Sequence, residues 1–290
     1  MKNTAHSVTA ARTAGASTDT YFTNFASDTE NAPLLIYLPG LDETGKDLIS
    51  LEMSDFKQDF EVRGLIIPAD DLADWDELAA AAIALTRHEI AKMPAGTPVC
   101  LCAESFGGCL GLRVLEQAPD LFDRVVLVNP ASSFHRVPWL NLGAWLMPLV
   151  PALFFNQPAD WLVFFLAPLH RISSEARQAL AKSTHDAPKE TLVKRLNLMR
   201  NFSLDAARLS RVTCPVLLVG SAGDRILPSV AEAHRLSQIF PGAQIVTLPY
   251  SGHACLAERD VNLDEIMRSR HLMPAPPMTA PPMTAPPTTI

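Results

Sequence analysis

The stretch Val99-Cys-Leu-Cys-Ala-Glu-Ser-Phe-Gly-Gly108 decides how this chain folds. An apolar run ends at a single serine, Ser105, and a segment typical of a helix follows it. Small residues stand two positions before and two positions after that serine, namely Ala103 and Gly107. Such residues allow the backbones of a strand and a helix to approach closely at a sharp turn. The stretch therefore predicts a strand, a tight turn that carries Ser105, and a helix.

Two downstream segments repeat this pattern of an apolar run followed by a polar residue. The run 215–220 precedes Asp224, and the run 244–248 precedes His253. In a parallel sheet, groups that follow the carboxyl ends of the strands gather along one edge. We therefore expect Ser105, Asp224 and His253 to meet there as nucleophile, orienting acid and general base. Taken singly, Asp224 is also typical of a turn, and His253 of a loop histidine that bonds only to backbone.

Stabilisation of a developing oxyanion requires backbone N–H groups beside the serine. The N–H of Phe106, the residue after the serine, is the first expected donor. The second is the N–H of Leu41, which follows an apolar run and the dipeptide Pro39-Gly40. We expect Gly40 and Gly107 to support this arrangement, because a glycine lets the backbone approach a ligand closely. A plain Pro-Gly turn is the alternative interpretation of the upstream segment.

The composition is typical of a globular protein with a large core. The chain has 290 residues, 48% of them hydrophobic, and a net charge of −7. No basic stripe is present, so nucleic acid is not an expected partner. The five cysteines lack metal-ligand spacing and indicate reduced thiols; with no metal or cofactor motif, neither a metal nor an organic cofactor is expected. No apolar block of a secretory signal occurs, so we expect an intracellular protein, cytoplasmic or plastid-like, rather than a secreted one.

Strands and helices alternate along most of the chain, which is typical of a mostly parallel sheet with helices on both faces. We expect strands over 34–38, 63–67, 99–103, 124–129, 215–220 and 244–248, and helices over 73–92, 106–117, 228–239 and 262–270. Residues 1–30 are rich in Ser, Thr and Ala, and residues 273–290 form a Pro-rich repeat. Both are expected to be disordered tails, which leaves residues 31–272 as one folded domain.

One segment, about 131–211, interrupts the alternation and is expected to form a helical cap. Its first half contains the apolar runs 138–147 and 160–166, which are too short to span a membrane. We expect these runs to line a pocket for an acyl or isoprenoid chain and to present a face that can touch a membrane; ordinary core is the alternative. The second half is expected to form amphipathic helices with a solvated basic face, comprising Lys182, Lys189, Lys194, Arg195 and Arg200.

The order of serine, aspartate and histidine after successive strands resembles that of α/β-hydrolases. More narrowly, the segments 37–45, 103–109 and 129–134 resemble the phytyl ester synthase and diacylglycerol acyltransferase-like proteins of plastids and cyanobacteria. This likeness covers most of residues 33–260. It implies an α/β-hydrolase fold with a cap insertion and the triad Ser105, Asp224 and His253. It also implies acyl transfer to, or release from, hydrophobic alcohols such as phytol or diacylglycerol.

Three departures from that family bear on the activity. Ala103 replaces a usual glycine, and Glu43 stands where members often have a glycine. Plant members carry an acyltransferase-like region after the hydrolase region, whereas a Pro-rich repeat follows here, which shifts the expectation toward plain esterase activity. The sequence thus predicts a serine hydrolase or acyltransferase that acts on lipophilic esters through an acyl-enzyme. Thioesterase or other α/β-hydrolase chemistry, and non-catalytic lipid binding on the same scaffold, are the alternatives.

Overall fold

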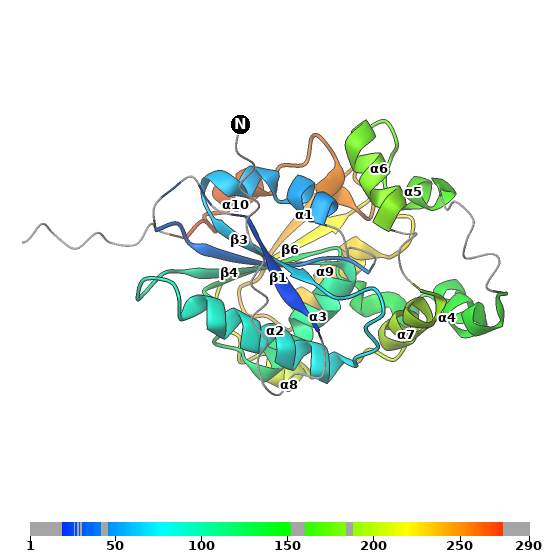
Figure 1. The fold of residues 1–290 in the computed structure, drawn as a ribbon, viewed down its shortest axis with the longest axis horizontal. Coiled ribbons are helices and arrows are strands. Elements are labelled where there is room, and N and C mark those ends of the chain that lie inside the picture. Colours follow the sequence, from blue (N-terminus) through cyan, green and yellow to red (C-terminus); the bar gives the residue numbers. More distant parts are fainter. Residues whose placement is uncertain are drawn as a thin grey trace, which may run out of the picture.

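The computed structural model describes residues 19–25, 27, 29, 31–41, 46–151, 160–183 and 188–274. Its centre is a seven-stranded sheet with helices on both faces (Figure 1). The strand order is β1-β3-β2-β4-β5-β6-β7, and every neighbouring pair is parallel except β1 and β3. The strands are β1 (Tyr21–Phe25), β2 (Leu34–Leu38), β3 (Glu61–Ile66), β4 (Val99–Glu104), β5 (Arg124–Val128), β6 (Val216–Ser221) and β7 (Gln244–Leu248). The predicted architecture is confirmed.

The two helical layers follow from the alternation of side chains along the buried strands. In β2, Leu34 and Ile36 belong to the core under one layer, whereas Leu35 and Tyr37 belong to the core under the other. Apolar residues on both sides of a strand are typical of a parallel sheet that is covered twice. The first layer comprises α2 (Trp75–Ile90), α3 (Ser105–Gln117) and α9 (Ser229–Ser237); the second comprises α1 (Lys46–Glu52), η1 (Ser54–Gln58) and α10 (Leu263–Ser269).

Local sequence explains where α2 begins. The side chain of Asp74 accepts hydrogen bonds from the N–H groups of Asp76 and Glu77, and the side chain of Glu77 accepts one from the N–H of Asp74. This reciprocal cap satisfies donors that the first helical turn leaves without partners. The observed helix is shorter than the predicted range 73–92 by two residues at each end, because the cap residue and the terminal turn lie outside the regular helix.

The edge strand β1 corrects the prediction that residues 1–30 are a disordered tail. Tyr21–Phe25 pairs antiparallel with β3, in a register that sets Tyr21 opposite Ile66. The segment has only five residues and lacks a strong apolar run, so its local pattern did not indicate a strand. Backbone pairing and contacts of Phe22 with the core stabilise it instead. Residues 1–18, residues 275–290 and Glu43, on which other predictions fall, lie outside the described residues.

A helical insertion separates β5 from β6, as expected. It includes η2 (Ala131–Arg136), α4 (Pro138–Leu146), η3 (Met147–Leu149), α5 (Asp160–Leu166), α6 (Ser174–Ser183), α7 (Lys189–Arg200) and α8 (Ala206–Leu209). In Figure 1, α4, α5, α6 and α7 lie at one end of the molecule, beyond one end of the sheet. None of the helices among the described residues is long and apolar enough to cross a membrane.

Candidate active site

Ser105 lies at the junction of β4 and α3, in the turn that the sequence predicted. Its φ of +53° falls in the left-handed region, which costs a residue with a side chain about 1–2 kcal/mol. The start of α3 packs tightly on the end of β2. A Cβ atom at Gly107 would lie 2.1 Å from the carbonyl oxygen of Leu38 and 2.3 Å from that of Pro39, so only glycine fits there. The surrounding contacts thus hold the serine in a strained and defined position.

The structure brings the three predicted side chains into one hydrogen-bonded chain. Ser105 Oγ lies 2.8 Å from His253 Nε2, and His253 Nδ1 lies 2.7 Å from Asp224 Oδ2. The residues follow β4, β7 and β6, whose carboxyl ends share one edge of the sheet. The histidine is buried, and the serine is partly exposed. A histidine between a hydroxyl and a carboxylate is the geometry that activates a serine for nucleophilic attack.

The electrostatics of Asp224 determine which histidine nitrogen carries hydrogen. Burial opposes ionisation, but the charge of His253 and hydrogen bonds from His253, Ser229 and the N–H of Leu227 outweigh it, so the pKa of Asp224 is lowered. Its Oδ1 accepts the N–H groups of Ile226 at 2.8 Å and Leu227 at 3.0 Å. An ionised carboxylate only accepts hydrogen bonds, so Nδ1 of His253 must donate. Nε2 is then left to accept the proton of Ser105.

The two predicted oxyanion donors lie on adjacent segments. Phe106 is in the first turn of α3, where helix geometry leaves N–H groups without an intrahelical acceptor. Leu41 follows the end of β2. Gly107 packs against the carbonyl oxygens of Leu38 and Pro39, just before Leu41. The partial positive charge at the start of a helix favours an anion near Phe106. Gly40 lies partly buried in the same loop. The roles of Leu41, Phe106, Gly40 and Gly107 in binding an oxyanion stay predictions.

The cap contributes a residue to this region that the sequence analysis placed wrongly. Arg195 of α7 was expected on a solvated face, but it is only 4% exposed. Its guanidinium donates to the carbonyl oxygen of Leu41 at 2.7 Å and to that of Pro68 at 3.1 Å. It also lies 6.0 Å from the centre of the Phe106 ring. Arg195 therefore ties the cap to both segments that carry the predicted oxyanion donors.

We predict that Arg195→Met lowers kcat for an ester substrate by about 10- to 100-fold, because the Leu41 N–H loses its fixed position. KM for a short-chain ester should change little, since such a substrate barely contacts the cap. Arg195→Lys should recover part of kcat, because an ammonium can still donate to the carbonyl of Leu41. Steady-state kinetics on the three proteins checks this. Equal losses of kcat in both variants, with a matching fall in melting temperature, would instead indicate general destabilisation.

Two buried residues that the sequence analysis did not select hold the loops of the site together. Asn129 follows β5 with φ +43°; it accepts the N–H of Ser221 at 2.8 Å and donates to the carbonyl of His253 at 2.7 Å. Glu258 accepts the N–H of Gly252 at 2.7 Å. The position of Asn129 at the end of the predicted strand 124–129 was a usable signal. Glu258 carried none, because it lies in a short irregular segment after the histidine.

Glu104, adjacent to the serine, points away from the reacting atoms. It is buried, and its carboxylate lies 2.9 Å from the hydroxyl of Tyr37, which also lies 2.7 Å from Glu52. These three side chains connect β4, β2 and α1 beneath the turn. The contact agrees with a bracing role and gives Glu104 no part in the chemistry.

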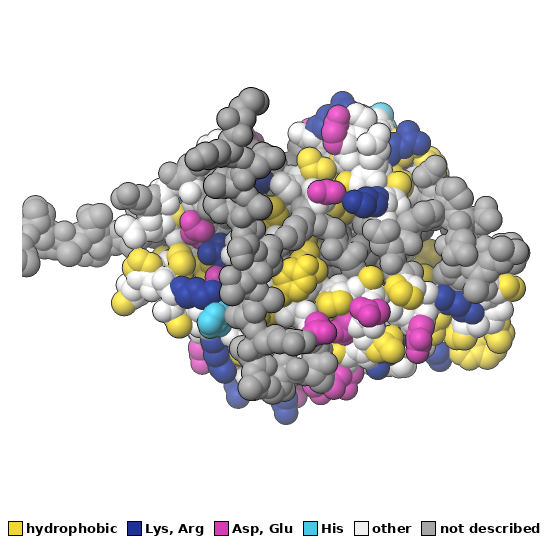
Figure 2. Space-filling view, viewed as in Figure 1, with side chains coloured by type: hydrophobic (Ala, Val, Ile, Leu, Met, Phe, Trp, Pro, Cys, Tyr) yellow, Lys and Arg dark blue, Asp and Glu magenta, His cyan; other side chains and the backbone are white. Residues whose placement is uncertain are grey.

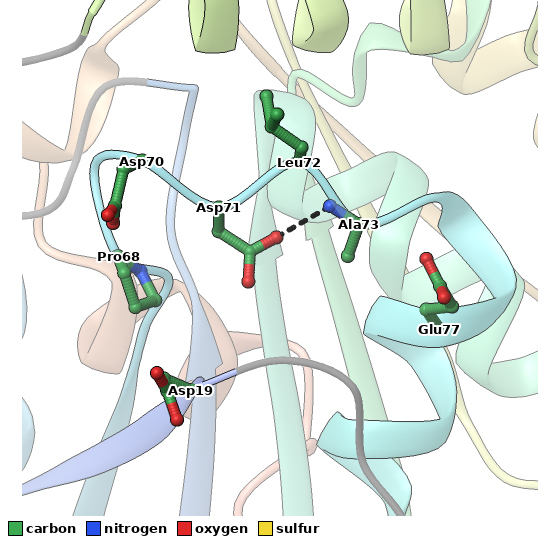
Figure 3. Close-up of a pocket in the computed structure, with 7 residues that line it drawn as sticks. All are labelled: Asp19, Pro68, Asp70, Asp71, Leu72, Ala73 and Glu77. Carbon is green, nitrogen blue, oxygen red and sulfur yellow. Dashed lines mark hydrogen bonds between the residues drawn. The ribbon is translucent and has the colours of Figure 1, made fainter.

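A polar cavity lies beside the segment that joins β3 to α2 (Figure 3). Pro68, Asp70, Asp71, Leu72 and Ala73 line it, together with Asp19 and Glu77. Burial raises the pKa of Asp71, although the N–H of Ala73 and the charge of Arg195 oppose that shift. Within the described ranges, no group of three or more His, Cys, Asp or Glu side chains is arranged to hold a metal ion.

Comparison with known proteins identifies the family. The model of the alpha/beta hydrolase family matches residues 38–265, which include all the predicted site residues. This chain is a member of that family. Its sheet order, its cap insertion and the turn at Ser105 are therefore features of an α/β-hydrolase. Among solved structures, the esterase RhEst1 from Rhodococcus sp. ECU1013 superposes with a TM-score of 0.68 at 14% identity, covering 87% of this chain and 93% of that one. At this identity the likeness shows the fold alone.

Two curated relatives narrow the comparison. Phytyl ester synthase 1, chloroplastic, of Arabidopsis thaliana is 30% identical over 261 residues, which is 82% of this α/β-hydrolase but only 37% of the plant protein. RutD of Enterobacter cloacae subsp. cloacae, a candidate carbamate hydrolase, is 29% identical over 248 residues, or 78% of this chain and 86% of that protein. The first likeness agrees with the narrower resemblance that the sequence analysis drew.

Proposed function

We propose that this protein is a serine hydrolase of lipophilic esters that works through an acyl-enzyme. The observation that carries the proposal is the continuous hydrogen-bonded chain from Ser105 through His253 to Asp224. A hydroxyl is a weak nucleophile because it keeps its proton at neutral pH, and an adjacent imidazole removes that proton during attack. Ser105 is then the nucleophile, His253 the general base and Asp224 the group that orients the imidazole and stabilises its charged form.

The first half of the reaction forms the acyl-enzyme. Ser105 Oγ forms a bond to the carbonyl carbon of the ester while its proton passes to His253 Nε2. The N–H groups of Leu41 and Phe106 are the proposed donors to the resulting oxyanion. The bond from carbon to the alcohol oxygen then breaks, and the imidazolium returns its proton to that oxygen. The alcohol leaves, and the acyl group stays on Ser105.

The second half depends on the acceptor. Water or a second alcohol gives its proton to His253 and attacks the acyl carbon; the bond to Ser105 Oγ breaks, and Oγ regains a proton from the imidazolium. Water yields a carboxylic acid, and an alcohol yields a new ester. The name of the Arabidopsis relative favours a long isoprenoid alcohol as one partner in the reaction. The RutD relative favours carbamate hydrolysis as a second candidate, which needs the same nucleophile and base.

We predict that kcat/KM for nitrophenyl esters rises about tenfold or more from the acetyl to the decanoyl ester, because each added methylene gains free energy on burial. The reaction is followed by release of nitrophenolate, and mass spectrometry with added phytol reports whether a phytyl ester forms. A rate that is flat or falls with chain length would contradict the lipophilic substrate. Labelling with a fluorophosphonate should place a covalent adduct on Ser105; no adduct would favour a non-catalytic lipid-binding protein.

A further inference from the structure

The helix α4 exposes several large apolar side chains on its surface. Exposed fractions of its large side chains and of those in the adjoining η3 run from 39% to 74%: Trp139, Leu142, Trp145, Leu146 and Leu149. These residues recur at three- to four-residue spacing and share one side of the helix. The other side is also apolar, since Ala144 is buried and Leu140 packs on the core. An exposed patch of this kind marks a binding surface.

Basic residues outnumber acidic ones on the elements next to this patch, although the whole chain carries a net charge of −7. Among the described elements, η2, η3 and α7 pack most closely against α4. Within these and α4 itself, Glu190 is the sole acidic residue, whereas the basic residues that are at least partly exposed are Arg136, Lys189, Lys194 and Arg200. Arg195 is buried and takes no part in this surface. Lys189 donates to the carbonyls of Pro148 and Val150, beside the exposed Leu149. Figure 2 shows hydrophobic side chains at the end of the molecule where α4 lies, with Lys and Arg side chains beside them.

We propose that this face of α4 docks on the surface of a bilayer that contains anionic lipids. Tryptophan and leucine on one side of a short helix insert into the boundary between headgroups and acyl chains, and flanking cations attract anionic headgroups. A second copy of this chain is a poorer occupant. A twofold contact would set the same basic rim against itself, and like charges repel. The inference goes beyond the proposed hydrolysis, because docking needs no turnover.

Vesicle flotation with the full-length protein tests the proposal. The protein should float with vesicles of phosphatidylcholine and phosphatidylglycerol and much less with phosphatidylcholine alone. Replacing both tryptophans, as Trp139→Ser and Trp145→Ser together, should weaken partitioning about tenfold or more, since two large apolar side chains no longer enter the bilayer. The matched control is Leu72→Ser, which removes a similarly exposed apolar side chain outside the cap and should leave partitioning unchanged.

The charges are tested in the same way. Arg136→Gln should weaken binding to anionic vesicles about fivefold and leave binding to neutral vesicles unchanged. Arg270→Gln, an exposed arginine that follows α10, is its control. Equal flotation of the wild type and the double tryptophan variant would overturn the proposal. A wild type that floats with neither the anionic nor the neutral vesicles would also overturn it. A dimer in light scattering that the tryptophan variant splits would identify a second copy as the occupant instead.

One further variant distinguishes docking from catalysis. Ser105→Ala should float with anionic vesicles as well as the wild type does, because the serine lies outside the docking face. Vesicle binding without any esterase activity would leave the docking proposal standing and overturn the proposed function. Esterase activity without vesicle binding would do the reverse.

Discussion

Ser105→Ala lowers kcat for a medium-chain nitrophenyl ester by at least about 10³-fold. The substitution removes the oxygen that would bond to the acyl carbon, and no other hydroxyl is hydrogen-bonded to His253 among the described residues. The remaining rate would come from the oxyanion donors and from substrate binding. Stopped assays with long incubation times measure such residual rates.

The fold should survive this change. Alanine at position 105 meets the same positive φ as serine, so the backbone strain stays, and only one hydrogen bond of about 1 kcal/mol is lost. Urea unfolding should therefore show a small change in stability. Ser133→Ala is a matched control, because Ser133 is buried and its hydroxyl has no hydrogen-bond partner in the part of the chain that the structure describes. If Ser105→Ala kept its rate, the assignment of the nucleophile would be wrong.

Asp224→Asn lowers kcat by about 10⁴-fold, because the amide no longer holds His253 in the tautomer whose Nε2 can accept the serine proton. The two carboxylate oxygens together accept four hydrogen bonds, from Ile226, Leu227, Ser229 and His253. An asparagine offers one acceptor oxygen and one donor group. In either orientation its NH₂ faces donors, so either the backbone turn or the imidazole loses its acceptor. Lost acceptors at a buried position should also cost about 1–3 kcal/mol of stability.

The sign of a pH effect follows from the lowered pKa of Asp224. The unfolded chain takes up this proton at a higher pH than the folded chain does. The stabilisation from the ionised carboxylate is therefore complete above the ordinary pKa of aspartate, near 4, and is lost as pH falls through the lower folded value. The stability gap between the wild type and Asp224→Asn should narrow as pH falls below about 4. A gap that widens on acidification would contradict the ionised state. For the loss of kcat, the control is Asp205→Asn at an exposed helix cap, which should keep the wild-type rate.

Residues that follow strands were the ones that sequence reasoning located well. Ser105, Asp224 and His253 come from three distant parts of the chain, yet the pattern of apolar runs sets each just past a strand end. Asn129 follows a strand in the same way, but its role depends on contacts with Ser221 and the histidine loop that no local pattern shows. Arg195 is the clearest failure. Five basic residues in one amphipathic region look alike in sequence, and only the packing of α7 on the Leu41 loop selects one of them.

The apolar runs of the cap are a second case that sequence alone did not resolve. Their composition indicated a pocket, a core or a membrane face, and only the packed structure shows Trp139 and Trp145 facing outward.

The sequence by itself determined the sheet, its two helical layers and the meeting of hydroxyl, imidazole and carboxylate. Side-chain periodicity and strand ends are visible in local sequence, and a parallel sheet brings the carboxyl ends of its strands to one edge. Only the tertiary structure decided that β1 joins the sheet, that Arg195 is buried against the Leu41 loop, and which face of α4 stays exposed. Each of these depends on a partner segment far along the chain, and the free energy that selects it arises from that contact rather than from the residues alone.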